Sequence, residues 1–231
     1  MQIRENKEGA LREEKPFASG MNFYKLFWVF FLGCIAGVIV ETLWCLFREH
    51  MIENRSGVIY GPFNPVYGFG ALIMTVCLHK LSKKRDIWIF FGSMVLGGAF
   101  EYVCSLFQEI VMGTISWDYS GMALEFGGRT SLLYSFFWGI LGLFWIKDLY
   151  PRLSRLIEKI PNKVGKPLTW VLCVFMIFNM AISSLAVMRQ TERHEGVPAE
   201  DPVREFLDRH YTDEFLAKIY PNMIFVEKES K

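Results

Sequence analysis

Two acidic side chains interrupt stretches of the sequence that are otherwise almost entirely apolar. Glu41 is the only charged residue between Lys25 and Arg48, and Glu101 lies within the apolar stretch 87–110. Intramembrane carboxylates are costly and commonly mark ion or substrate pathways. Two neighbouring carboxylates disfavour double ionisation, so that one of them can hold a proton near neutral pH. The pair predicts proton or cation handling. The alternative is that each glutamate bonds a neighbouring helix and only locks the bundle.

Each glutamate lies on a stripe of small residues spaced by four. The stripes comprise Gly33, Gly37, Glu41 and Cys45 in one stretch, and Ser93, Gly97, Glu101 and Ser105 in the other. Small residues let helix backbones approach closely, so we expect the stripes to pack helices and the glutamates to face the bundle interior. If the two stripes face one another, the carboxylates become near neighbours.

Two loops supply the other candidates for a substrate or ion pathway. The loop at 54–68 contains glycines and two prolines, which indicate sharp turns at membrane depth, and the loop at 115–129 adds an acid and a base. The candidates are Tyr60, Tyr67, Trp117, Asp118, Tyr119 and Arg129. We expect Arg129 to be the counter-ion of the glutamates. An interfacial aromatic belt explains Tyr60, Trp117 and Tyr119 equally well, and a turn or helix cap explains Asp118.

Several classes of site lack a sequence signal. No His, Cys and carboxylate spacing is typical of a metal site, and no nucleophile motif indicates a catalytic residue. We therefore expect no metal and no cofactor. The formal net charge of +1 gives no overall attraction to nucleic acid, so membrane lipids are the expected surroundings. A lone Asn179 in the last apolar stretch is predicted to bond between helices.

The elements that position these residues are apolar stretches long enough to be helices in lipid. The chain of 231 residues is 52% hydrophobic, and five such stretches occur at 23–47, 63–79, 87–110, 131–146 and 168–188. We predict an all-α, polytopic membrane helix bundle of about five transmembrane helices. The bundle spans 23–188, between an N-terminal segment, 1–22, and a polar C-terminal tail, 189–231. The second and fourth stretches are short, so either they tilt little or loop covered by protein continues them.

Lysine and arginine predict the orientation. Basic residues gather at 80–85 and 147–166, which places these connections and the N-terminus in the cytoplasm and the chain in the cell membrane. With five spans the tail lies outside. Arg189 and Arg193 oppose that side, because basic residues directly after a span favour the cytoplasm.

The chain matches itself at an offset of 60 residues, which superposes Trp28 on Trp88, Gly37 on Gly97 and Glu41 on Glu101. Farther along, the offset is 67, where Tyr67 meets Tyr134. Four helices are therefore predicted to form two parallel helix-loop-helix repeats, 23–79 and 87–146, with 168–188 as an extra helix. Chance similarity between apolar helices is the alternative.

Several short motifs between about residues 23 and 150 resemble the bacterial membrane family known as ABC-transporter type IV, or CmpB-like. The motifs are Glu41, Tyr60–Pro62, Pro65–Gly68, Glu101–Tyr102, Trp117–Ser120, Gly128–Arg129, Leu133–Ser135 and Trp138–Gly139. Ser56 and Gly127 depart from the family's pattern in the two loops. The resemblance implies a permease that works with a separate ATPase, since this chain has no phosphate-binding loop of its own.

Three functions remain open. The first is a transporter or permease component of undetermined substrate, with Glu41, Glu101 and Arg129 along the path and with an ATPase subunit or a second copy as partner. The second is a membrane enzyme acting on a lipid or small molecule, in which a glutamate is the base and Arg129 binds an anionic group. The third is an accessory or sensor protein whose tail binds another protein.

Overall fold

The computed structural model describes residues 16–226, which are mostly helical. The helices are α2 (Phe23–Glu49), α3 (Pro65–Leu78), α4 (Asp86–Met112), α5 (Leu132–Phe144), α6 (Tyr150–Glu158), α7 (Asn162–His194), α8 (Pro202–His210) and α9 (Asp213–Ile219). Short turns occur at η1 (His79–Leu81) and η2 (Trp145–Leu149). The two-residue strands β1 (Thr114–Ile115) and β4 (Ile224–Phe225) pair antiparallel, as do β2 (Glu125–Phe126) and β3 (Thr130–Ser131). The predicted all-α membrane bundle is confirmed. Residues 1–15 of the predicted N-terminal segment and 227–231 of the tail lie outside the described residues.

Four helical stretches in the described part of the chain are long and apolar enough to cross a membrane: Phe23–Arg48, Asp86–Met112, Leu132–Glu158 and Asn162–His194. The predicted second span differs. Helix α3 has 14 residues, and at ~1.5 Å per residue it covers about 21 Å of the ~30 Å apolar layer. By length, therefore, four of the five expected spans are present among the described residues, and the second corresponds to a shorter apolar helix, Pro65–Leu81.

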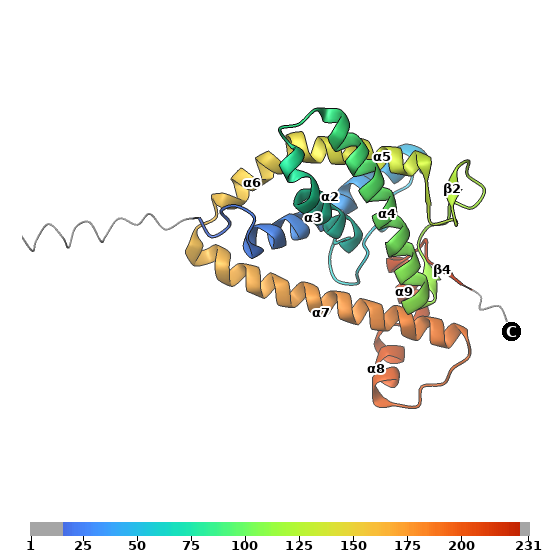
Figure 1. The fold of residues 1–231 in the computed structure, drawn as a ribbon. Coiled ribbons are helices and arrows are strands. Elements are labelled where there is room, and N and C mark those ends of the chain that lie inside the picture. Colours follow the sequence, from blue (N-terminus) through green and yellow to red (C-terminus); the bar gives the residue numbers. More distant parts are fainter. Residues whose placement is uncertain (1–15, 227–231) are drawn as a thin grey trace, which may run out of the picture.

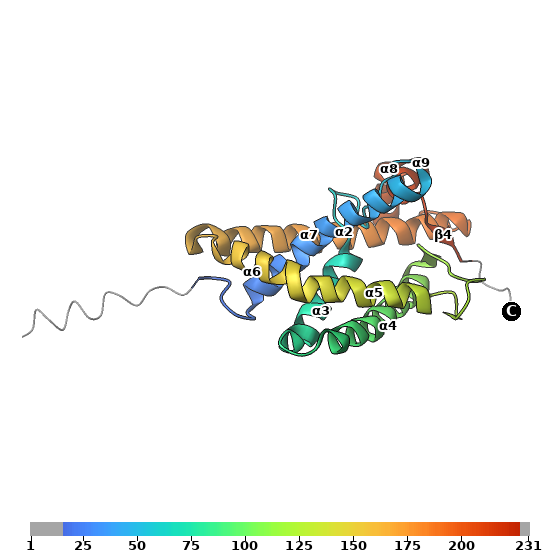
Figure 2. The ribbon, with the colours of Figure 1, turned by 90° about the horizontal axis from the view of Figure 1, so that it is seen from above.

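The helices run between two ends of the molecule, which differ in character. At the basic end, Lys147 Nζ lies 2.7 Å from Asp86 Oδ1, and the buried Lys25 Nζ lies 2.5 Å from Glu158 Oε1. The loop end carries residues 50–64, residues 113–131 and the C-terminal residues 195–226, here called the appendage. Helix α7 runs along one side and holds the appendage near its C-terminal end (Figure 1). Helices α4 and α5 lie together on the opposite side (Figure 2).

Two of the expected spans are longer than their apolar stretches. The helix beginning at Leu132 continues through η2 and α6 to Glu158, although Pro151 lacks the N–H that a helix interior uses. The wide π turn of η2 ends two residues before this proline, and the helix continues past it. Helix α7 extends the predicted 168–188 at both ends. The start of the predicted polar tail is thus helical.

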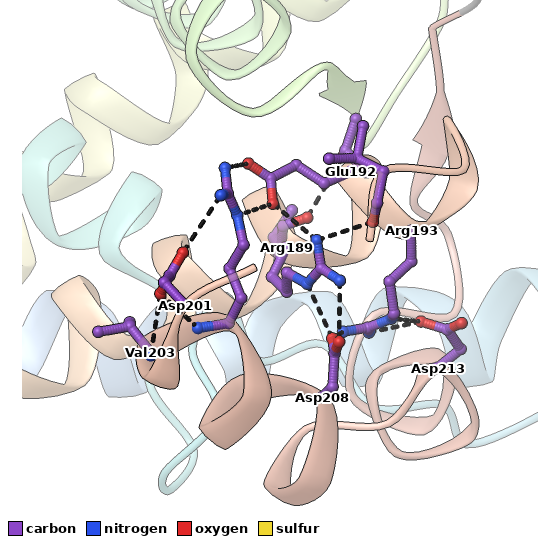
Figure 3. Close-up of polar contacts among 11 residues, drawn as sticks. Arg189, Glu192, Arg193, Asp201, Val203, Asp208 and Asp213 are labelled. Carbon is purple, nitrogen blue, oxygen red and sulfur yellow. Dashed lines mark hydrogen bonds and ion pairs between the residues drawn. The ribbon is translucent and has the colours of Figure 1, made fainter. Parts of the chain in front are cut away.

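An ion-pair network joins the appendage to the end of α7 (Figure 3). Arg189 is only 3% exposed and makes a bidentate contact with Asp208, with nitrogen–oxygen distances of 2.9 and 2.8 Å. Arg193 contacts both Asp208, at 2.6 Å, and Asp213, at 2.5 Å. The neighbouring Arg189 and Arg193 guanidinium groups lower the pKa of Asp208 to about 2. The two arginines are therefore neutralised by carboxylates of the appendage.

Candidate functional site

Residues 57–64, here called the entry segment, return into the bundle before α3 begins. The Asn64 backbone N–H donates to the carbonyl of Cys34, near the middle of α2, at 3.0 Å. Val58 and Ile59 are buried, and the rings of Phe31 and Phe63 lie 5.2 Å apart between their centroids. Non-helical chain that packs against protein thus precedes the short α3. For the short second apolar stretch, the sequence left two explanations open, little tilt or continuation by protein-covered loop, and the structure has the second.

Side chains of helix α7 form hydrogen bonds with polar backbone groups of the entry segment. The Asn179 side chain accepts a hydrogen bond from the Tyr60 N–H at 3.1 Å and donates to the Tyr60 carbonyl at 2.7 Å. One turn later, Ser183 Oγ accepts from the Ile59 N–H at 2.9 Å. Asn179 is fully buried. It bonds to loop backbone, whereas the sequence predicted a bond between helices.

Glu41 lies at the interface of the first hairpin, α2 and α3. The Tyr67 hydroxyl donates a hydrogen bond to Glu41 Oε1. Tyr67 also packs directly over Gly37, where an added Cβ would collide with its ring. The small residue at position 37 therefore makes room for the phenol that holds the carboxylate one turn away.

Glu101 has a corresponding place in the second hairpin, α4 and α5, and is 7% exposed. Thr130 Oγ1 donates to Glu101 Oε2 at 2.8 Å, and the Tyr119 hydroxyl donates to Oε1 at 2.9 Å. Trp138 packs over Gly97, as Tyr67 does over Gly37. Burial, followed by the nearby Glu101 charge, raises the pKa of Tyr119, which therefore stays protonated and donates.

The two small-residue stripes do not face one another. Gly33 packs against Ala71 of α3, whereas Ser93 packs against Gly142 of α5. Each stripe thus closes its own hairpin, and α3 contacts α4 between them. The two hairpins still meet through aromatic rings, because Tyr67 and Trp138 lie 6.3 Å apart between ring centroids.

Arg129 does not pair with either Glu41 or Glu101, contrary to expectation. Its guanidinium forms a salt bridge with Glu109, which raises the pKa of Arg129, and it lies 5.8 Å from the centre of the Tyr102 ring. Its neighbour Thr130, the first residue of β3, donates to Glu101 in its place. The positive charge of Arg129, just before α5, is therefore paired with Glu109 and not with Glu41 or Glu101.

A pocket of about 460 Å³ opens at the loop end. It is lined by Arg48 at the end of α2 and Arg55 in the first loop, by Ser116, Trp117, Asp118, Tyr119 and Met122 in the second loop, by Tyr134 of α5, and by Pro221, Asn222, Met223 and Ile224 of the appendage. Three predicted pathway residues, Trp117, Asp118 and Tyr119, thus share one cavity. Tyr60 is not among its lining residues. Its hydroxyl bonds to that of Tyr211 at 2.8 Å.

The lining includes two arginines that the sequence analysis did not select. Arg55 lies 3.1 Å from Glu53, and the charge of Glu41 also acts on it. Burial alone would lower the pKa of Arg55, but its bond to Cys45 and the nearby carboxylates raise it overall. A possible signal was the pair of basic residues, Arg48 and Arg55, on the side predicted to be poor in positive charge. Their separation by a loop concealed that they share a pocket.

The comparison with protein families now bears on this arrangement. The chain matches the family described as "Putative ABC-transporter type IV" over residues 28–184. It belongs to this family. No curated protein and no solved structure matches the chain.

The family region and the pocket have different limits. The match covers nearly all of both hairpins, the entry segment, and Asn179 and Ser183, which bond to that segment. Glu41 and Glu101 thus lie within the region that matches the ABC-transporter type IV family. The match ends at residue 184, before the arginines of α7 and the whole appendage. One wall of the pocket, Pro221–Ile224, is thus built by chain beyond the family region.

Proposed function

We propose that this chain is the membrane component of a transporter, in which the loop-end pocket receives a solute and the two glutamates, Glu41 and Glu101, line the route beneath it. The observation that carries the proposal is the position of Tyr119. Its side chain lines the pocket and donates its hydroxyl proton to Glu101. One aromatic residue therefore connects an open cavity to an intramembrane carboxylate, and buried carboxylates of this kind commonly serve transport.

We further infer that the two hairpins are parallel repeats. Three close contacts of the first hairpin have counterparts in the second, displaced by 60 residues in the leading helix and 71 in the following one. The paired contacts are Phe30–Gly68 with Phe90–Gly139, Gly33–Ala71 with Ser93–Gly142, and Gly37–Tyr67 with Gly97–Trp138. The packing favours 71 over the offset of 67 expected from sequence. Each following helix thus provides an aromatic side chain that packs over the glycine one turn before the glutamate of its own hairpin.

The basic end is proposed to face the cytoplasm, with the pocket outside. Lys80, Lys83, Lys84 and Arg85 lie at that end, together with the turn between α6 and α7. Arg189 and Arg193 argue against this orientation only if their positive charges are unpaired. Their pairing with Asp208 and Asp213 supports it, because a neutralised arginine contributes little to the positive-inside preference. A separate ATPase or a second copy would then dock at the basic end.

Proton flux into proteoliposomes tests the route. The full-length protein is reconstituted with a trapped pH-sensitive dye, and an imposed membrane potential drives uptake. We expect Glu101→Gln and Glu41→Gln to slow flux about tenfold or more, since a positioned proton carrier contributes at least that factor. Glu109→Gln is the control, because Glu109 pairs with Arg129. Flux that equals that of empty liposomes, or that survives both substitutions, would contradict the proposal.

The membrane-enzyme alternative receives less support from this geometry. It requires Glu101 and Arg129 around one substrate, whereas Arg129 points to Glu109, and neither Glu101 nor Arg129 is among the residues lining the pocket. The sensor alternative depended on a tail available to a partner. The appendage instead packs Leu207, Tyr211 and Leu216 against Ile59 and Ala186 of its own chain.

A further inference from the structure

We propose that the appendage binds the phospholipid surface at the loop end of the molecule. In this arrangement α8 lies in the interface between lipid and water, and its exposed apolar residues, Val203 and Phe206, contact the lipid. The inference concerns how chain beyond the family region meets the membrane, and it does not depend on what the protein transports.

The depth of α8 follows from its contacts with α7. Residues 167–188 of α7 carry no charge. At ~1.5 Å per residue they extend about 33 Å, which matches the ~30 Å apolar layer, so the layer ends near Arg189. Asp208 of α8 bonds to Arg189, whereas Leu207 belongs to the same buried cluster as Ala186, about one turn farther into the layer. Helix α8 thus lies at the boundary of the apolar layer.

A series of aromatic contacts connects α8 with the exposed side of α7. Phe178, near the middle of the uncharged stretch, is 56% exposed and stacks on Tyr60, with ring centroids 6.5 Å apart. The Tyr60 hydroxyl bonds to that of Tyr211 at 2.8 Å, and the rings of Tyr211 and Phe206 lie 6.3 Å apart between centroids. The exposed surface of the appendage therefore continues a surface of α7 that lipid must cover.

The order of side chains around α8 turns its apolar flank toward the lipid. In a helix with 3.6 residues per turn, Leu207 neighbours Asp208 on the side of the apolar layer. Farther around in the same direction lie Val203 and Phe206, which are 59% and 47% exposed. Glu205 lies on the opposite flank, beyond Asp208, and is also exposed. A helix with one apolar and one charged flank at this depth is typical of the membrane interface.

Helix α8 lies on the side of α7 that is away from α4 and α5 (Figures 1 and 2). It therefore projects past the two helices of the second hairpin, over the area where lipid surrounds α7. Pro221–Ile224 of the same appendage line the loop-end pocket. The lipid surface would thus help to hold one wall of that pocket in place.

Photocross-linking in liposomes of phosphatidylcholine and phosphatidylglycerol tests the contact. The full-length protein carries benzoylphenylalanine in place of Phe206, and the acyl chains of the lipids are radiolabelled. We expect at least about fivefold more labelled lipid to be attached at position 206 than at position 205, because the second position faces water. Glu205 is the matched control, one residue away on the charged flank.

Val203 is a second labelling position on the apolar flank. Its replacement leaves the contact between the rings of Phe206 and Tyr211 in place, so that a folding defect at position 206 does not decide the result. We expect lipid to attach at position 203 as it does at 206. Lipid labelling at both positions that is no greater than at 205 would refute the inference. A cross-linked dimer of the chain in place of a lipid adduct would assign the flank to a second copy and would also overturn it.

Discussion

The hydrogen bonds between Asn179 and the entry segment give the most direct test of the fold. Asn179→Leu keeps the side-chain volume similar and removes both bonds to the Tyr60 backbone. A polar group left unsatisfied away from water costs about 1–3 kcal/mol, and an interhelical hydrogen bond in a membrane averages ~0.6 kcal/mol. Two such bonds give a range of about 1–6 kcal/mol. Because Asn179 is fully buried, we expect about 3 kcal/mol of lost stability.

The loss is measured as a shift in the free energy of unfolding in mixed micelles. Ser183→Ala, which removes the acceptor of the Ile59 N–H, should cost about half as much, since one bond to the entry segment is lost in place of two. Ser184→Ala changes the next hydroxyl of the same helix and serves as its matched control. If the free energy of unfolding of Asn179→Leu lay within about 0.5 kcal/mol of the wild-type value, the stabilising role of the Asn179–Tyr60 hydrogen bonds would be refuted. A change that small is the usual effect of a neutral surface substitution.

Two further predictions concern helix packing and the appendage. Gly97→Ala places a methyl group against Trp138 and should lower the free energy of unfolding by about 1–3 kcal/mol. Gly92→Ala meets only the end of the Leu78 side chain and should lower it much less. Thermal unfolding of the two variants compares these losses. Asp208→Asn should expose 195–226 to protease by removing up to about 2 kcal/mol, the equivalent of lowering its pKa from 3.8 to about 2. A lowered pKa in the folded protein means that this contribution is complete above about pH 4 and is lost as the pH falls through 2, so wild-type protection should fall only in strong acid.

Periodicity and apolar length predicted most of the fold because lipid leaves the backbone few choices. Long apolar stretches must be helices there, so α2, α4 and α7 follow from composition alone. The helix boundaries were less predictable. Pro151 suggests an interruption after α5, but the helix continues past it through a π turn, which has no sequence signal of this kind. The length of α3 depends on where the entry segment packs, which is a tertiary property.

The candidate site was predictable where a residue breaks the apolar pattern. Glu41 and Glu101 stand out for that reason, and so do the small residues one turn before them. Their partners were not predictable, because hydrogen bonds join distant parts of the chain. The error on Arg129 has this origin, since charge alone favoured Glu101, whereas the neighbouring Thr130 gives that carboxylate a hydroxyl. Arg48 and Arg55 became related only through the shape of the pocket.

Helix α7, the extra span outside the two hairpins, explains how these parts work together. Loop at membrane depth needs partners for its backbone, and the first hairpin supplies the Cys34 carbonyl, which accepts from the Asn64 N–H of its own entry segment. Asn179 and Ser183 of α7 supply three further hydrogen bonds to that segment. The second hairpin has its loop held differently, through β1, which pairs with β4 of the appendage. Because the arginines at the end of α7 hold the appendage, a single helix stabilises both loops around the pocket. A change in α7 should therefore reach the pocket from either loop.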